Sequence, residues 1–432
     1  MAFPLQPTII MARFLAAFTL TIVLAGSSFA ATRITYDING AAIPIEWSEA
    51  SFPLRYEIDQ RLASVNPNAK ATVDRAFAAW AAVPDAGVRF ESSGVVASSA
   101  GRAANRIGVT LADELFSDQG AAAVTSYTYD TNTGLMLDAG ITVDPQLFDG
   151  NINPQMALQH EIGHALGLDH SAVLSSVMYP YTSGGTQSVD LELDDRIAIA
   201  SIYPKHGQAL IGATLRGRVV GDHGGIFAAQ VVAVNDNGQP VGSVLTNAAG
   251  EFSIASIPAG RYRLYAEPLD GPVDIGALQG SWRQAKLISF PTEFFAGSID
   301  VESGKVYGNL VLNTTGSISL NPRWIGVSPA GRSDVSLSAS AATVRPGENV
   351  TIAIGGDGFS AATTFEVMNP AFRRTSDFIR ASNYVQASYA VSSSASPTSA
   401  VVVVRNGQQT AMLTGALRVY GQGTGRSRAA GK

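Results

Sequence analysis

The chain has 432 residues, of which 46% are hydrophobic and 15% are charged. This length suits two or three domains, and the apolar content excludes an intrinsically disordered protein. Its 29 basic and 35 acidic residues give a net charge of -6, which argues against a nucleic-acid partner because nucleic acids bind basic surfaces.

The chain begins with the pattern of a secretory signal peptide. Arg13 precedes an apolar run over residues 14–26, and the small residues Ser27, Ser28 and Ala30 follow it. We therefore expect residues 1–30 to be removed on export. The alternative is an uncleaved membrane anchor, but the run is shorter than the roughly 20 residues of a spanning helix. The pattern predicts a protein that is secreted, periplasmic or at the cell surface, without stable membrane insertion.

Residues 31–205 mix strand-like and helix-like patterns, which predicts an α+β domain with a sheet and a few long helices. The spacing of Val73, Phe77 and Trp80 predicts a helix over residues 71–83. Asn153 and Pro154 are typical of a helix start. Strands are predicted over residues 54–58, 87–90, 106–111 and 137–143.

After residue 205 the composition shifts to short β-rich runs separated by turn residues, so two all-β sandwich domains are predicted, over residues 210–315 and 316–420. In the first, strands are expected over residues 214–220, 230–234, 251–257 and 262–267. In the second, residues 345–348 separate two strands, and a hairpin with a two-residue turn follows residues 400–404. Residues 421–432 are expected to be a disordered tail.

Three of the five histidines, His160, His164 and His170, lie close together in the sequence. Positions i and i+4 share one face of a helix, so His160 and His164 point two imidazoles at one ion. Gly167 is suited to end the helix in a left-handed conformation, and the turn brings His170 round as a third ligand. With no cysteine in the chain, three neutral nitrogen ligands and an open fourth position indicate one catalytic Zn²⁺.

Glu161 directly follows the first ligand, so its carboxylate reaches the metal-activated water and not the ion. We assign Glu161 as the general base and then as the proton donor to the leaving amine. Zinc would lower the pKa of the water and polarise the scissile carbonyl. The pattern predicts an endopeptidase that hydrolyses peptide bonds of a protein or peptide substrate.

The segment over residues 160–170 has the pattern H-E-x-x-H-x-x-G-x-x-H, which resembles the signature of the metzincin metalloproteases. Ser171 and the segment over residues 191–203 resemble the matrixin branch. The resemblance implies the metzincin fold, in which a twisted mixed sheet packs against long helices. Because the chain has no cysteine, the cysteine switch of animal matrixins is impossible here.

The same resemblance implies roles for the segment after the third histidine. Met178 is expected to form the methionine turn, an apolar floor below the zinc. Tyr179, Pro180 and Tyr181 are expected to line the pocket for the substrate residue after the cut. The acidic pair Asp194 and Asp195 either fixes the methionine turn or is simply a carboxylate pair at a helix N-terminus.

The two β domains also resemble known families. Residues 210–315 resemble a carboxypeptidase-regulatory-like domain, and residues 316–420 resemble immunoglobulin-like domains of bacterial surface proteins. These domains suggest contact with a cell surface or with carbohydrate. Trp282 or Trp324 is the candidate for carbohydrate binding, although tryptophans are more often core residues.

Two alternatives stay open. Asp138, Asp144 and Asp149 are candidate Ca²⁺ ligands, although surface carboxylates near a turn are the preferred interpretation. The chain could also be a non-catalytic surface adhesin with a structural zinc site. A structural site is normally closed by a fourth protein ligand and does not need Glu161.

Overall fold

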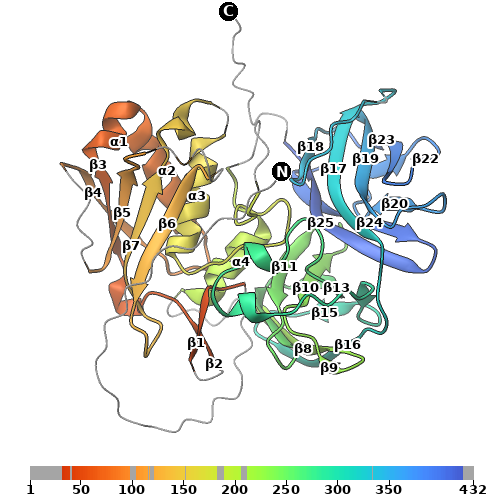
Figure 1. Cartoon of the computed structure of the whole chain (residues 1–432), viewed down its shortest axis with the longest axis horizontal. Coiled ribbons are helices and arrows are strands. Elements are labelled where there is room, and N and C mark those ends of the chain that lie inside the picture. The colour runs from red at the N-terminus through yellow and green to blue at the C-terminus, as the bar shows by residue number, and fades with distance from the viewer. Residues whose placement is uncertain are drawn as a thin grey trace, which may run out of the picture.

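The computed structural model describes residues 32–38, 41–97, 104–114, 116, 121–150, 152–181, 189–205, 212–332 and 334–421. The expected signal peptide lies outside these residues, as does the expected tail except for Gly421. Figure 1 shows an N-terminal region (residues 32–205, red to yellow) beside a middle β region (212–314, green) and a C-terminal β region (317–421, blue). None of the described helices combines the length and the apolar character needed to cross a membrane.

The N-terminal region is built on a five-stranded sheet with the order β4-β3-β5-β7-β6. Its strands are β3 (Leu54–Asp59), β4 (Phe90–Val96), β5 (Arg106–Leu111), β6 (Ala123–Tyr129) and β7 (Met136–Val143). β6 alone runs antiparallel to its neighbour, so the sheet is mixed, as predicted. A separate hairpin joins β1 (Thr35–Ile38) to β2 (Ala41–Pro44).

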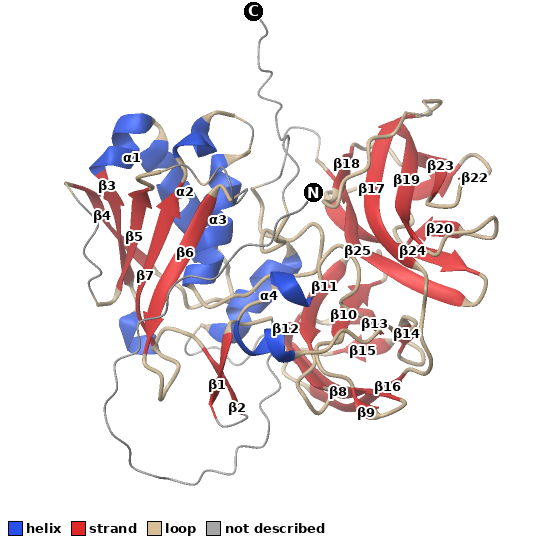
Figure 2. Cartoon of the chain, in the orientation of Figure 1, coloured by secondary structure: helices blue, strands red, loops and turns tan. Residues whose placement is uncertain are grey.

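The helices of this region are α1 (Gln60–Val65), α2 (Ala69–Ala81), α3 (Pro154–Ala165) and α4 (Leu193–Ile202). Figure 2 shows α2 and α3 packed on one face of the sheet. α2 buries Val73, Phe77 and Trp80 on its inner side, which is the periodicity that predicts it. Phe77 stacks on Tyr56 of β3 at 4.0 Å between ring centroids. The core therefore fixes α2 and α3 on the sheet.

Two strands of the five-stranded sheet differ from the sequence prediction. The strand expected over residues 87–90 instead begins at Phe90 and continues to Val96. β6 was not predicted, because every residue after Ala123 is only partly buried at the sheet edge and the strand shows no alternation of buried and exposed side chains. Both differences concern the two edge strands, where burial imposes the weakest pattern.

The middle β region consists of two sheets around one hydrophobic core, as expected for a sandwich. One sheet has the order β11-β10-β13-β14 with β15 on β13, and the other has the order β12-β8-β16 with β9 on β8. The strands are β8 (Ala213–Gly221), β9 (Gly224–Gly225), β10 (Gln230–Asn235), β11 (Pro240–Leu245), β12 (Glu251–Ile257), β13 (Gly260–Glu267), β14 (Glu293–Phe294), β15 (Ile299–Val301) and β16 (Val306–Asn313). Between β13 and β14 the chain leaves the sheet in an excursion over residues 268–292.

The C-terminal β region also has two sheets, with the orders β17-β19-β23-β21, where β22 pairs with β23, and β18-β25-β24-β20. The strands are β17 (Asn321–Pro329), β18 (Ala342–Val344), β19 (Asn349–Asp357), β20 (Thr364–Val367), β21 (Phe372–Arg374), β22 (Ile379–Arg380), β23 (Tyr384–Val391), β24 (Thr398–Asn406) and β25 (Gln409–Val419). Asn406 pairs with Gln409 across the predicted two-residue turn. The resemblance to immunoglobulin-like domains stays a prediction.

Residues of the N-terminal region pack into the hydrophobic cores of both β regions. Ile197 of α4 belongs to the core of the middle β region, and Leu174 and Tyr179 belong to that of the C-terminal β region. Arg418 of β25 forms an ion pair with Glu192 at 2.6 Å, and both side chains are nearly buried. The C-terminal β region thus holds the segment between α3 and α4, and the middle β region holds α4 itself.

Candidate metal centre

The helix that carries the histidines begins and ends where the sequence predicts. At its start, Asn153 Oδ1 accepts a hydrogen bond from the Gln155 backbone N–H at 3.1 Å, and Pro154 is the first helical residue. At its end, Gly167 has a φ of 92°. The N–H of Gly167 donates to the carbonyl of His164 at 2.9 Å, and that of Leu168 to the carbonyl of Gly163 at 3.0 Å. A Cβ at Gly167 would lie 2.3 Å from the Ile45 carbonyl oxygen, so only glycine fits this turn.

This geometry brings three imidazoles to one point. The Nε2 atom of His160 lies 3.1 Å from that of His164 and 3.2 Å from that of His170, and the latter two are 3.2 Å apart. Tetrahedral ligands at the usual Zn–N distance of about 2.0–2.1 Å are separated by about 3.3 Å, so the three nitrogens match one zinc ion. In the described part of the chain, this is the only group of three or more His, Asp or Glu residues whose ligand atoms lie within 4.8 Å of one another.

The second nitrogen of each ring faces a backbone carbonyl. Nδ1–H of His160 donates to the carbonyl of Val177 at 2.7 Å, and that of His164 to the carbonyl of Leu168 at 2.8 Å. Nδ1–H of His170 donates to the carbonyl of Ala277, 107 residues further along the chain, at 2.5 Å. Because a carbonyl only accepts, Nδ1 carries the proton and Nε2 keeps its lone pair for a metal.

Burial keeps two of the three ligands, His164 and His170, neutral. It lowers the pKa of His164 well below its ordinary value and lowers the pKa of His170 to about 3. Neutral imidazole is the form that binds a metal ion. The site is therefore ready for a cation near pH 7 without first losing protons from these two rings.

The Glu161 carboxyl group lies beside the triad but is not part of it. Its side chain is 8% exposed, and Oε2 accepts a hydrogen bond from Thr125 Oγ1 of β6 at 2.6 Å. Burial raises the pKa of Glu161 above its ordinary value. Thr125 was missed in the sequence because β6 itself was missed; one threonine carries no motif that would have identified it.

Met178 lies below α3, as the resemblance implies. Its side chain is 2% exposed, and its sulfur contacts the helix at Gly163. Asp195 holds the methionine turn, since its carboxylate accepts hydrogen bonds from Ser176 Oγ at 2.5 Å, from Val177 N at 3.0 Å and from Met178 N at 3.2 Å. The Asp195 carboxylate also accepts from the Glu192 backbone N at 2.9 Å at the start of α4, so both roles left open for the acidic pair hold for Asp195.

Asp194 links the site to the middle β region. One carboxylate oxygen accepts from Ser171 Oγ at 2.7 Å, next to the third histidine. The other accepts from the backbone N and the Oγ of Ser243 in β11, at 2.7 and 2.9 Å. Burial raises the pKa of Asp194 to about 7, with a smaller contribution from Asp195.

A cavity lies where the N-terminal region meets the C-terminal β region, next to Tyr179 and Tyr181. This cavity beside the methionine turn is lined by Met156, Val177, Tyr179 and Tyr181, whereas Pro180 does not line it. Residues of the C-terminal β region form its opposite wall, among them Ile325, Val327, Ser338, Ser340, Ala341 and Ala342. Tyr179 Oη donates to the carbonyl of Ala339, and Ser340 Oγ donates to that of Tyr181 at 3.2 Å.

The other candidate ligands and binding residues do not gather into a site. Asp138, Asp144 and Asp149 do not form a group of the kind described for the histidines. Asp144 instead accepts hydrogen bonds from the backbone of Phe116 and Gln146, so a turn explains it. Trp282 is 3% exposed and is a core residue, whereas Trp324 is 40% exposed.

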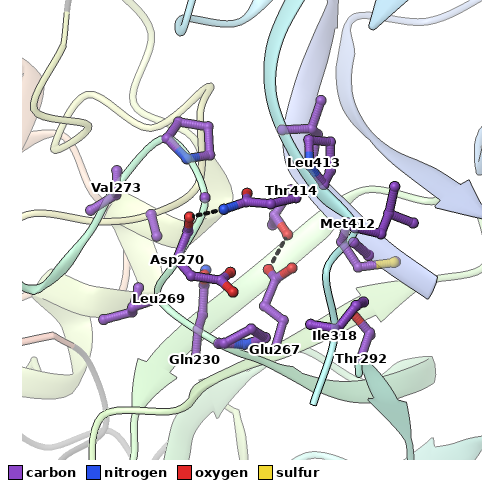
Figure 3. A pocket seen from close by; sticks show the side chains of 18 of the residues that line it. Gln230, Glu267, Leu269, Asp270, Val273, Thr292, Ile318, Met412, Leu413 and Thr414 are labelled. Atoms are coloured by element: carbon purple, nitrogen blue, oxygen red, sulfur yellow. Dashed lines mark hydrogen bonds between the residues drawn. The ribbon is translucent and has the colours of Figure 1, made fainter. Parts of the chain in front are cut away.

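A second cavity lies between the middle and C-terminal β regions, and none of the histidines lines it (Figure 3). Gln230, Glu267 and Thr414 line it, and Thr414 Oγ1 donates to Glu267 Oε1 at 2.6 Å. Burial raises the pKa of Glu267 to about 8. The carboxyl group is thus protonated at neutral pH, and the cavity carries no metal-binding cluster of described residues.

Comparison with protein families identifies two parts of the chain. Residues 46–204 match the matrixin family, and residues 214–270 match the carboxypeptidase regulatory-like domain. The resemblance found in the sequence is therefore confirmed for both parts.

Among curated proteins, human matrilysin is 36% identical over 88 residues, which cover 19% of this chain and 33% of matrilysin. Karilysin from Tannerella forsythia is 34% identical over 93 residues, covering 18% of this chain and 19% of karilysin. Metalloendoproteinase 2-MMP from Arabidopsis thaliana is 52% identical over 44 residues, covering 10% of this chain and 12% of its own. The chain thus spans about a third or less of the length of these relatives.

Proposed function

We propose that this chain, in which residues 46–204 form a matrixin domain, is an exported zinc-dependent endopeptidase. One observation carries the proposal: the Nε2 atoms of three imidazoles converge on one point, and the Glu161 carboxyl group lies next to them without joining the ligand set. The mixed sheet, the antiparallel edge strand β6 and the position of Met178 under α3 support the metzincin fold for this domain.

His160, His164 and His170 would hold the zinc ion through Nε2. When bound, zinc supplies a Lewis acid that makes a water molecule nucleophilic near neutral pH. Glu161 accepts the proton of the attacking water and passes it to the nitrogen of the leaving amine. Thr125 orients the carboxylate through its hydroxyl, and β6 offers an exposed edge beside which an extended peptide can lie.

The alternative, an adhesin with a structural zinc, receives less support. A structural site is closed by four protein ligands, whereas no fourth His, Asp or Glu joins the triad among the described residues. An open fourth position and a buried carboxyl group next to the first ligand suit hydrolysis better.

We propose that the cavity beside the methionine turn receives the substrate side chain that follows the cut. It lies next to the site, because Val177 lines it and also accepts the hydrogen bond from His160. Among the described residues that line it, Arg418 is the only charged one, and Arg418 is paired with Glu192. The pocket therefore favours a large uncharged side chain.

The test compares the full chain with its Glu161→Gln variant on gelatin or casein. We expect zinc-loaded wild type to cleave, chelator to abolish cleavage, and Glu161→Gln to lower the rate by roughly 10²–10⁴-fold with unchanged zinc content. Equal cleavage by both proteins would remove Glu161 from the mechanism. Absence of cleavage by the zinc-loaded wild type on any unfolded substrate would overturn the proposal.

A further inference from the structure

The third metal ligand is held by a different region from the other two. His160 and His164 donate Nδ1–H to carbonyls of the N-terminal region, but His170 donates to Ala277, in the excursion that leaves the middle β region between β13 and β14. A 3-10 turn over Ile275–Ala277 presents this carbonyl, and the Asp274 side chain caps the turn by accepting from Gly276 N at 2.8 Å.

The residue before the third ligand is held by the same excursion. The Asp169 side chain is 1% exposed, and one of its oxygens accepts from the backbone N–H of His170 at 2.7 Å. The other accepts from the backbone N–H of Gln279 at 2.8 Å. The Asp169 carboxylate therefore bridges the backbone of the ligand to the backbone of the excursion.

The excursion is anchored on both sides, so it is a rigid support. Leu278 and Trp282 are buried against Ala228 and Leu245 of the middle β region. On the other side, Trp282 Nε1–H donates to the Arg33 carbonyl at 2.8 Å. Gly280 has a φ of 57°, and a Cβ there would lie 1.7 Å from the Thr35 carbonyl oxygen, so the backbones are in close contact.

We propose that residues 274–280 of the middle β region are a positioning element of the metal centre, which fixes the ring of His170 through the Ala277 carbonyl and its backbone through Asp169. The β region is then part of the metal site and not a detachable binding module. A partner of this kind fixes the tautomer and the orientation of a ligating histidine, and its loss typically weakens metal binding by about 10–100-fold. The inference rests on the metal site of the proposed function but not on peptide cleavage.

The test measures the zinc dissociation constant of the full chain by competition with a chromophoric chelator. Gly280→Ala pushes the excursion away from Thr35, whereas Gly271→Ala makes the same chemical change in the same excursion, where the nearest atom to the added carbon is Pro322 O at 3.8 Å. We expect Gly280→Ala to weaken zinc binding by about 10–100-fold and Gly271→Ala to leave it within about twofold of wild type. Equal affinity of both variants and wild type would overturn the proposal.

A second pair of variants decides the matter if Gly280→Ala fails to fold, as judged by circular dichroism of the metal-free protein. Gln279→Pro removes the N–H that binds Asp169, and Gln279→Ala keeps it. Weaker zinc binding in the proline variant alone supports the proposal, and equal binding in both contradicts it. If Gly280→Ala binds zinc more weakly and the wild type cleaves no peptide, this proposal stands and only the peptidase function is rejected. A wild-type chain that binds no zinc would reject both.

Discussion

The sulfur of Met178 occupies the space next to Gly163 where any other residue would place its Cβ. A Cβ at Gly163 would lie 2.2 Å from Met178 Sδ and 3.1 Å from the ring of Trp80. The helix that carries His160 and His164 can therefore rest directly on the methionine turn. This contact sets the distance between the helix that carries His160 and His164 and the methionine turn below it.

Gly163→Ala should destabilise the protein, although Gly→Ala inside a helix is normally stabilising. Overpacking of this kind costs about 1–3 kcal/mol, and Met178 must shift to relieve it. Thermal unfolding of the metal-free chain measures the effect. Gly140→Ala is the control, because the nearest atom to its added carbon is Ser126 Oγ at 3.4 Å. An unfolding midpoint for Gly163→Ala equal to that of wild type would show that the contact is not tight.

Thr125→Val should lower kcat for peptide hydrolysis by about tenfold and leave zinc affinity unchanged, because the Glu161 carboxylate loses the hydroxyl that orients it. Thr125→Ser keeps a hydroxyl at the same place and should retain most of the rate. Steady-state kinetics on one fluorogenic peptide compares the three proteins. A valine variant as fast as the serine variant would mean that Thr125 does not position the base.

Ala341→Phe should narrow the pocket from the side of the C-terminal β region. We expect kcat/KM to fall about tenfold or more for peptides with a large residue after the cut, and to fall less for peptides with alanine there. Ala362→Phe, at an exposed turn of the same region, is the control. A profile of cleavage sites that is the same in both variants would place the substrate pocket elsewhere.

Glu267→Gln should reduce the loss of stability at alkaline pH. The folded protein holds the Glu267 proton up to a pKa of about 8, whereas the unfolded chain releases it near its ordinary value of 4.5. Between these values the folded state binds more protons, so stability falls as pH rises. At pH 9 the free energy of unfolding of the variant should exceed that of wild type by an amount on the order of a few kcal/mol. At pH 4 the two free energies should agree.

Unfolding midpoints between pH 4 and 9 test this expectation, with Glu114→Gln as the control at an exposed position. Parallel pH profiles for wild type and Glu267→Gln would mean that the carboxyl group is not protonated in the folded protein.

The metal ligands could be predicted because each leaves a signal in the sequence. His160 and His164 are four residues apart on one helix. Gly167 follows the end of that helix and has the left-handed conformation predicted for a glycine at this position. The core helix α2 was predicted for the same reason, since burial of Phe77 and Trp80 imposes a period that can be recognised.

The supports of the site could not be predicted. Ala277 contributes a backbone carbonyl, which any residue type could supply, so its side chain gives no signal in the sequence. It also lies 107 residues from its partner His170. Thr125 belongs to an edge strand that buries too little to show an alternating pattern. The pocket wall at Ala341 arises from packing between regions, which local sequence patterns do not encode.

The most direct test of the metal centre is an X-ray absorption spectrum of the zinc-loaded full chain. The account predicts one zinc per chain, bound by three imidazole nitrogens at about 2.0–2.1 Å and by one further oxygen from solvent. A fourth protein ligand, fewer than three histidine nitrogens, or a chain that retains no zinc would contradict it.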